Sequence, residues 1–129
     1  MTQPWPTVAT QDRILEALSG LQPLAEVFDG DCLDRAPLVT QTLVEAGLPA
    51  EDRWLTAWTD QQVVMFCHKL TVVGDWAVDD TARQFDKSLP QRWIASVWVY
   101  LARLTSAAGA RRAALNPTPL LVFPEEVGS

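Results

Sequence analysis

Two runs rich in β-branched and aromatic residues, 63–73 and 76–81, are separated only by Gly74 and Asp75. A Gly-Asp pair between two such runs is a hairpin signal, because glycine adopts the backbone angles that a two-residue turn requires. The chain is therefore expected to build an antiparallel sheet around this hairpin.

The register of this hairpin decides which side chains share a face. With a two-residue turn, Leu70 faces Asp79, and side chains alternate between the two faces of each strand. His68 then lies on the same face as Asp79 and is its diagonal neighbour, at roughly 7 Å between backbones. A turn of three residues would reverse the alternation and bring Asp80 to His68 instead, and we prefer the two-residue turn.

Apolar residues recur at helical spacing in three other parts of the chain, 12–28, 32–46 and 94–104. The alternating stretch 53–59 suits a further strand. This order predicts an α+β fold, with N-terminal helices packed on a small antiparallel sheet and a C-terminal helix. We expect one domain over residues 1–129, with its core at about 10–110 and extended tails at 1–9 and 116–129.

The second of these helices begins next to a cysteine. Asp31 can cap a helix that starts at Cys32, and Gly47 stands where such a helix ends. Pro37 lies past the first turn, so this helix begins irregularly or is regular only after Asp34.

Composition narrows the classes of function. Hydrophobic residues make up 48% of the chain, which is enough for a packed core. Sixteen acidic against ten basic residues give a net charge of −6, and Arg111-Arg112 is the one basic pair, so neither nucleic acid nor a membrane is an expected partner. The first ten residues lack the pattern of a signal peptide. We expect a cytoplasmic protein with reduced thiols, or an effector exported without a recognisable signal peptide.

The chain has one histidine, so any histidine-dependent chemistry runs through His68. A thiolate is stabilised by a helix N-terminus and by a neighbouring imidazolium, and Cys32 stands at a predicted helix start. A carboxylate behind an imidazole holds the ring in one orientation. Cys32, His68 and Asp79 are therefore the candidate catalytic residues, although each of the three residue types is also common in a purely structural role.

Three segments together resemble a known group of proteins. They are Gly-Asp-Cys at 30–32, the histidine strand at 68–73, and Asp-Asp-Thr-Ala-Arg-Gln-Phe at 79–85. The chain thereby resembles papain-like and transglutaminase-like bacterial proteins, including papain-fold toxins and protein deamidases. The resemblance extends over about 30–104, and the segment at 79–85 is its most specific part.

The resemblance implies that Cys32 is the nucleophile, His68 the general base and acid, and Asp79 the residue that orients the histidine. Asp80 departs from the pattern, since proline or an apolar residue often follows the aspartate; this second carboxylate either competes for the histidine or is solvated. No upstream glutamine matches the usual oxyanion donor, so that role is left to the backbone N–H of Cys32.

The function expected from these residues is that of a thiol-dependent hydrolase or acyl-transferase acting on an amide or thioester in a protein or peptide. Peptidase, glutamine deamidase and transglutaminase-like activities share this chemistry. The alternative is a catalytically inactive papain-like module that holds a protein partner, with Cys32 buried and inert. No cofactor is expected.

A metal site is not expected either. Cys67 follows the strand alternation and points away from His68, so the two cannot share a zinc ion. We expect Cys67 to fill the core. Arg83 and Gln84 either contact substrate or brace the chain after the hairpin, and we favour bracing.

Overall fold

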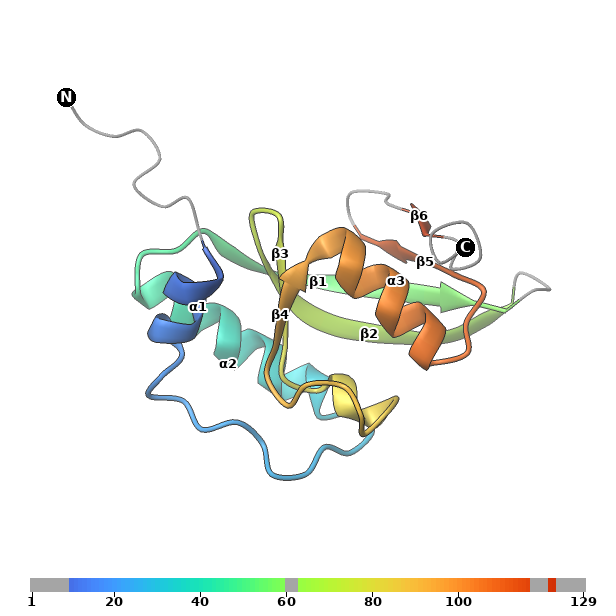
Figure 1. Ribbon diagram of the computed structural model, residues 1–129, viewed down its shortest axis with the longest axis horizontal. Helices are drawn as coiled ribbons and strands as arrows, with labels where there is room; N and C mark the ends of the chain where they lie inside the picture. Colours follow the sequence, from blue (N-terminus) through green and yellow to red (C-terminus); the bar gives the residue numbers. More distant parts are fainter. Residues whose placement is uncertain (1–9, 60–62, 117–120, 123–129) are drawn as a thin grey trace.

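The computed structural model describes residues 10–59, 63–116 and 121–122. In these residues, six strands form one antiparallel sheet in the order β4-β3-β2-β1-β5-β6 (Figure 1). The elements in chain order are α1 (Gln11–Ala17), α2 (Cys32–Glu45), β1 (Ala50–Trp58), β2 (Val64–Val73), β3 (Trp76–Asp79), the short 3-10 helix η1 (Ala82–Gln84), β4 (Trp93–Ser96), α3 (Val97–Ala107), β5 (Arg112–Leu115) and β6 (Leu121–Val122). The expected α+β class is confirmed.

The hairpin of β2 and β3 has the expected register. Val72 is opposite Ala77, and Val73 is opposite Trp76, so Gly74 and Asp75 form a two-residue turn. Gly74 has a φ of 59°, in the left-handed region that such a turn uses.

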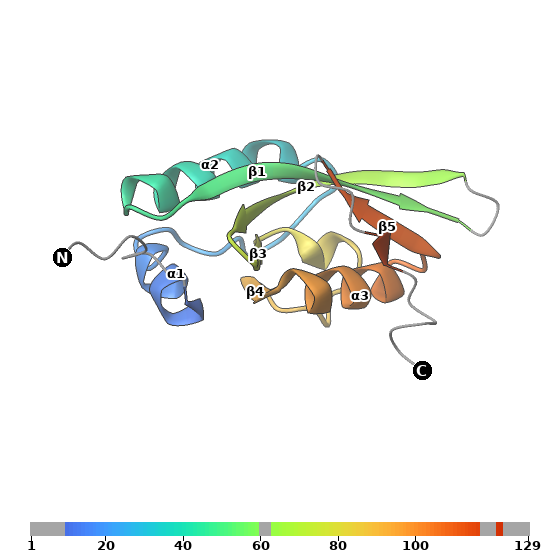
Figure 2. The ribbon, with the colours of Figure 1, turned by 90° about the horizontal axis from the view of Figure 1, so that it is seen from above.

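The sheet separates two layers of helices, with α2 on one face and α3 on the other (Figure 2). Strand β2 contributes to both layers, because neighbouring side chains point to opposite faces. Val72 packs in a core cluster with Leu101 and Leu104 of α3, whereas Val73 packs in a second cluster with Leu43 of α2.

The region after Pro90 differs from the sequence expectation. Ile94 lies in β4, where it pairs with Val78, and not in the helix. Ser96 is the N-cap of α3, and its side chain accepts a hydrogen bond from the N–H of Val99. By periodicity alone, a short apolar stretch fits either a strand or the first turn of a helix. Pairing with the edge of β3 stabilises the strand here.

The C-terminal side of the core also extends further than expected. Residues 112–115 form β5, which pairs with β1 from Leu55↔Leu115 to Trp58↔Arg112. The core therefore does not end at 110. The expected tail at 1–9 and most of the tail at 116–129 lie outside the described residues.

Helix α2 begins at Cys32, as expected, but Asp31 does not cap it with its side chain. Asp31 already has helical backbone angles (φ −61°, ψ −25°), and its carboxylate accepts a hydrogen bond from the N–H of Phe28 at 2.8 Å. The helix continues through Pro37. The carbonyl of Leu33, which loses its helical donor there, belongs to an exposed residue that water can reach.

Helix α2 ends in a Schellman motif. The N–H of Leu48 donates to the carbonyl of Leu43 at 3.0 Å, and the N–H of Gly47 donates to the carbonyl of Val44 at 2.9 Å. Gly47 has a φ of 88°, which places this residue in the left-handed region, as its position in the sequence suggests.

Substituting Gly47→Ala should lower the free energy of unfolding by about 1 kcal/mol, because a Cβ disfavours the left-handed backbone. Urea denaturation followed by circular dichroism measures this. Gly20→Ala is the matched control, since Gly20 has no positive φ and a Cβ there meets no atom within 4 Å. Equal effects of the two substitutions would contradict the assignment of strain to Gly47.

Candidate active site

His68 and Asp79 form a buried pair at the centre of the candidate site. His68 lies on β2 with none of its surface exposed, and Asp79 is the last residue of β3. Nε2 of His68 lies 2.7 Å from Oδ2 of Asp79. The hairpin register thus brings Asp79 to the histidine, as the two-residue turn predicts.

The Asp79 carboxylate has further hydrogen bonds on both oxygens. Oδ1 accepts from the backbone N–H of Thr81 at 2.7 Å and from the Thr81 hydroxyl at 3.0 Å. Oδ2, which binds His68, also accepts from the Tyr100 hydroxyl at 2.5 Å. These donors replace the water that the carboxylate loses on burial and hold it in one orientation.

Sequence reasoning missed Tyr100, although a signal for it exists. Tyr100 is the one tyrosine of the chain, and it lies in the apolar stripe of α3, packed on Trp93 with ring centroids 4.7 Å apart. A tyrosine in a buried stripe needs a partner for its hydroxyl, and Asp79 is that partner.

Cys32 meets the histidine from the other side. It is the first residue of α2 and is 4% exposed, and its thiol interacts with the His68 ring and with the backbone N–H of Lys69. Nε2 of His68 is hydrogen-bonded to Asp79, whereas Nδ1 is buried and has no hydrogen-bond partner among the described residues. Nδ1 is therefore the ring nitrogen that is left for the thiol.

The early end of β3 makes room for this thiol. Strand β3 pairs with β2 only over 71–73. In such a hairpin, every second residue of β2 points its backbone groups toward β3, and Lys69 is the next of these after Thr71. Since β3 has ended, the N–H of Lys69 faces the side chain of Cys32 instead.

The three groups shift one another's ionisation. Burial raises the pKa of the Cys32 thiol, but the His68 ring and the Lys69 N–H outweigh it, so that this pKa is lowered. Burial lowers the pKa of His68, whereas the charge and hydrogen bond of Asp79, with a further effect of Cys32, raise it to about 9. Both shifts favour a thiolate next to an imidazolium near neutral pH.

The pKa values of Asp79 and Tyr100 shift in opposite directions. Burial raises the pKa of Asp79, but the charge and hydrogen bond of His68 and the hydrogen bond of Tyr100 lower it, so Asp79 is ionised. Burial, and then the charge of Asp79, raise the pKa of Tyr100 well above its usual value, so its hydroxyl keeps its proton and donates.

Asp80 neither competes for the histidine nor is solvated. It is 3% exposed, and its carboxylate binds Arg35 and Arg92. Both sequence expectations for Asp80 are therefore wrong. Residues on α2 and in the segment before β4 supply the two cations, and no local spacing in the sequence connects them to Asp80.

Cys67 is also placed differently from the expectation. It lies on the strand face opposite to His68, but it is exposed and does not fill the core. Its sulfur lies 4.0 Å from the hydroxyl of Thr56 on β1.

Within the described ranges, no group of three histidine, cysteine or acidic side chains could hold a metal ion. In the same residues, no helix is long and apolar enough to cross a membrane.

Arg83 braces the chain, as favoured from the sequence. Its Nε donates to the carbonyl of Leu89 at 2.8 Å. Gln84 lies in η1 next to Phe85, whose ring stands edge-on to the His68 ring with centroids 5.0 Å apart. Phe85 and Phe66, with ring centroids 4.5 Å apart, cover this side of the histidine.

Substituting Tyr100→Phe should lower the free energy of unfolding by roughly 2 kcal/mol, because a buried carboxylate loses a donor while the ring volume stays the same. Urea denaturation at pH 7 measures the change. A loss below about 0.5 kcal/mol, typical of a surface position, would show that the hydroxyl does not stabilise Asp79.

The pH dependence of stability tests whether Cys32 and His68 titrate as a pair. Because the pKa of His68 rises from 6.5 to about 9 on folding, its stabilisation is complete below pH 6.5 and is lost as the pH rises through 9. The pKa of Cys32 is lowered from 9.0, so its stabilisation is complete above pH 9 and is lost as the pH falls through the lowered value. Where the two windows overlap, the opposite slopes cancel.

In wild type, the free energy of unfolding should therefore change little in the part of the range from pH 6.5 to 9 that lies above the lowered pKa of Cys32. In Cys32→Ala, the contribution of His68 stands alone and should make stability fall by up to about 1.4 kcal/mol per pH unit above pH 6.5. Urea denaturation across this range measures both slopes. The same slope in the two proteins would mean that the thiol and the imidazole are not coupled.

Comparisons with known proteins identify no relative of the chain. The chain matches no family model, no curated protein and no solved structure. The chemistry of the site therefore has to be inferred from its own geometry and charges.

Proposed function

We propose that the chain is a thiol-dependent hydrolase or acyl-transferase that acts on an amide or thioester, built on a papain-like or transglutaminase-like core. The observation that carries the proposal is the order of the three side chains. The Asp79 carboxylate binds Nε2 of His68, and the Cys32 thiol interacts with the same ring, whose Nδ1 has no hydrogen-bond partner among the described residues.

Each group has a role in this chemistry. The thiolate of Cys32 attacks the carbonyl carbon, and the C=O π electrons move to the oxygen to give a tetrahedral oxyanion. His68 donates its Nδ1 proton to the leaving amine or thiolate as the C–N or C–S bond breaks, which leaves an acyl-enzyme. Water or an amine then attacks, His68 accepts its proton, and the thiolate leaves. Asp79 keeps Nδ1 directed at the sulfur throughout.

The helix start supplies a donor for the oxyanion. The N–H of Leu33 already donates to the carbonyl of Gly30, and the N–H of Asp34 donates to the carbonyl of Asp31. The N–H of Cys32 has no backbone acceptor among the described residues. It is therefore the donor best suited to an oxyanion formed on the Cys32 sulfur.

The open edge of β2 suits an extended peptide. On the side of β3, no described strand pairs with residues 64–70 of β2. By the alternation of the strand, the backbone groups of Cys67 face this edge in line with Lys69, and the register of β2 against β1 shifts only beyond Phe66. A peptide that paired there would lie next to Cys32, which supports a protein or peptide as the substrate.

The second candidate function is a binding module without catalysis. The observation that favours it is the burial of Cys32, which is only 4% exposed. A thiol that no substrate reaches would act as a packing group, and the shell around it would hold a partner protein. The two functions differ in whether Cys32 reacts.

The pH dependence of alkylation by iodoacetamide separates them. Because Cys67 is exposed, the experiment uses a Cys67→Ser background and reads the label on Cys32 by mass spectrometry. An enzyme should react with an apparent pKa below about 8.5, and His68→Ala should lower the rate at pH 7 by roughly tenfold or more, since one pKa unit is a factor of ten.

Cys32→Ala in the same background is the control and should take up no label. A rate with an ordinary thiol pKa, unchanged by His68→Ala, would reject the enzymatic proposal and favour the binding module. A reactive Cys32 would justify testing peptide amides and thioesters as substrates.

A further inference from the structure

Asp80, the residue directly after Asp79, binds two arginines with a side chain that is 0% exposed. Arg92 binds it as a fork, with Nε 2.9 Å from Oδ1 and Nη2 2.8 Å from Oδ2. Nε and Nη2 of Arg35 both lie 3.0 Å from Oδ2. Two arginines bind one carboxylate, and both arginine side chains are only 10% exposed. We call this cluster of Asp80, Arg35 and Arg92 the junction.

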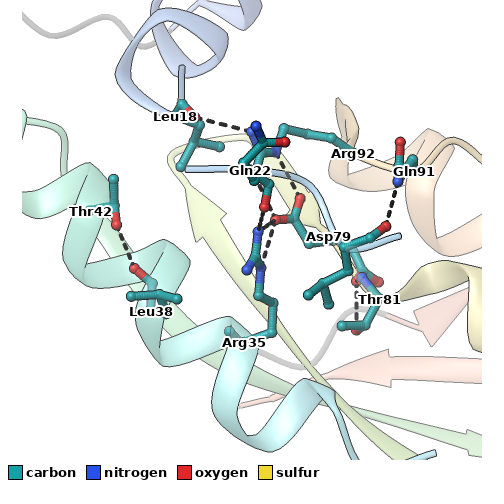
Figure 3. A network of polar contacts seen from close by, with 12 residues as sticks. Leu18, Gln22, Arg35, Leu38, Thr42, Asp79, Thr81, Gln91 and Arg92 are labelled. Carbon is teal, nitrogen blue, oxygen red and sulfur yellow. Dashed lines mark hydrogen bonds and ion pairs between the residues drawn. The ribbon is translucent and has the colours of Figure 1, made fainter. Parts of the chain in front are cut away.

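The same arginines also bind the chain that leads into α2. Nη1 of Arg92 donates to the carbonyl of Leu18, at the end of α1, at 3.1 Å. Nη2 of Arg35 donates to the carbonyl of Gln22 at 2.5 Å. Figure 3 shows Arg35, which extends from α2 toward Arg92, with Gln22 and Leu18 beside them. The end of α1 and the start of α2 are thereby attached to the end of β3.

Two residues of the junction lie close in the chain to candidate catalytic residues. Arg35 follows Cys32 by three residues on α2, so the two side chains lie on neighbouring positions of one helix face. Asp80 follows Asp79 by one residue. The Arg35–Asp80 ion pair therefore joins α2, which carries Cys32, to the end of β3, which carries Asp79.

The other side-chain attachments of α2 to the sheet lie further along the helix. Thr71 of β2 donates to the carbonyl of Ala36 at 3.1 Å, and its hydroxyl lies 2.9 Å from that of Thr40. They hold the middle of the helix, and Arg35 holds its first turn. Because the interaction of a thiolate with an imidazolium weakens quickly with distance, a small shift of the first turn would weaken it.

We propose that Asp80, Arg35 and Arg92 are positioning residues that hold Cys32 against Nδ1 of His68. This inference rests on the proposed function, because it concerns the same thiol. The three residues act through the place of the helix start and do not touch the reacting atoms. Buried ion pairs add little to stability over apolar side chains of the same volume, which agrees with a role in geometry.

Two substitutions separate positioning from charge. Arg35→Lys keeps the positive charge but loses the planar fork, so charge alone predicts an unchanged pKa of Cys32, whereas loss of position predicts a higher one. Asp80→Asn removes a negative charge, so charge alone predicts a lower pKa of Cys32, whereas loss of position again predicts a higher one. The sign of the change therefore distinguishes the two effects.

The measurement is the pH profile of Cys32 alkylation by iodoacetamide in the Cys67→Ser background. Arg35→Lys and Asp80→Asn should each raise the apparent pKa of Cys32 and slow the reaction at pH 7 by about threefold to tenfold, which corresponds to half to one pKa unit. Arg92→Lys should act in the same direction. Arg53→Lys is the matched control, because Arg53 pairs with the exposed Glu51 at 3.1 Å on β1, and it should leave the profile unchanged.

Circular dichroism and a cooperative thermal transition identify the variants that keep the fold, and Arg35→Lys is the mildest of them. An unchanged or lowered pKa of Cys32 in the folded Arg35→Lys variant overturns the positioning role and leaves the proposed function intact. An ordinary thiol pKa of Cys32 in wild type overturns both the positioning role and the proposed function, because the protein then stabilises no thiolate at this position.

Discussion

The hydrogen bond between His68 and Asp79 joins the two strands that carry the site, and it buries a charge that the fold has to compensate. His68 has none of its surface exposed, and Asp79 has 2%. An ionised carboxylate without partners would be costly at this depth. The donors Thr81 and Tyr100 replace its lost hydration, and they come from the chain directly after β3 and from α3. The helix on one face of the sheet and the turn at its edge are thus both required by one buried carboxylate.

The length of β3 determines what the rest of the site can be. If β3 continued past Asp79 in register, the backbone of Asp80 would pair with Lys69 and close the edge of β2. Because the chain turns away at Thr81, the N–H of Lys69 is left for the start of α2, which places Cys32 beside the histidine. The thiol, the imidazole and the carboxylate therefore meet where a strand is missing, and each comes from a different secondary-structure element.

The sequence predicted the parts of the site that depend on local geometry. A two-residue turn fixes the alternation of side chains by counting, so the pairing of His68 with Asp79 could be worked out from Gly74 and Asp75. The start of α2 at Cys32 followed in the same way from local signals. The papain-like or transglutaminase-like identity of the core stays a prediction.

What sequence reasoning missed depends on contacts between residues far apart in the chain. Tyr100 reaches Asp79 from 21 residues away, and Arg35 reaches Asp80 from 45. No periodicity or turn rule connects such positions. Cys67 was wrongly placed in the core for a related reason, because alternation gives the face of a strand but does not say whether a helix covers that face.

Asp79 and Asp80 are two buried carboxylates in adjacent positions, one at the end of β3 and one directly after it, and they bind different partners. Consecutive side chains of an extended chain point to opposite faces, so Asp79 turns toward α3 and Tyr100, and Asp80 turns toward α2 and Arg35. Two like charges in neighbouring positions would otherwise repel each other and share the nearest cation. The arginines neutralise Asp80 where it lies, which leaves Asp79 as the carboxylate that interacts with His68. A residue that first looks like a competitor of the orienting carboxylate thus binds a different set of cations, and the separation follows from the strand alternation that brings Asp79 to the histidine.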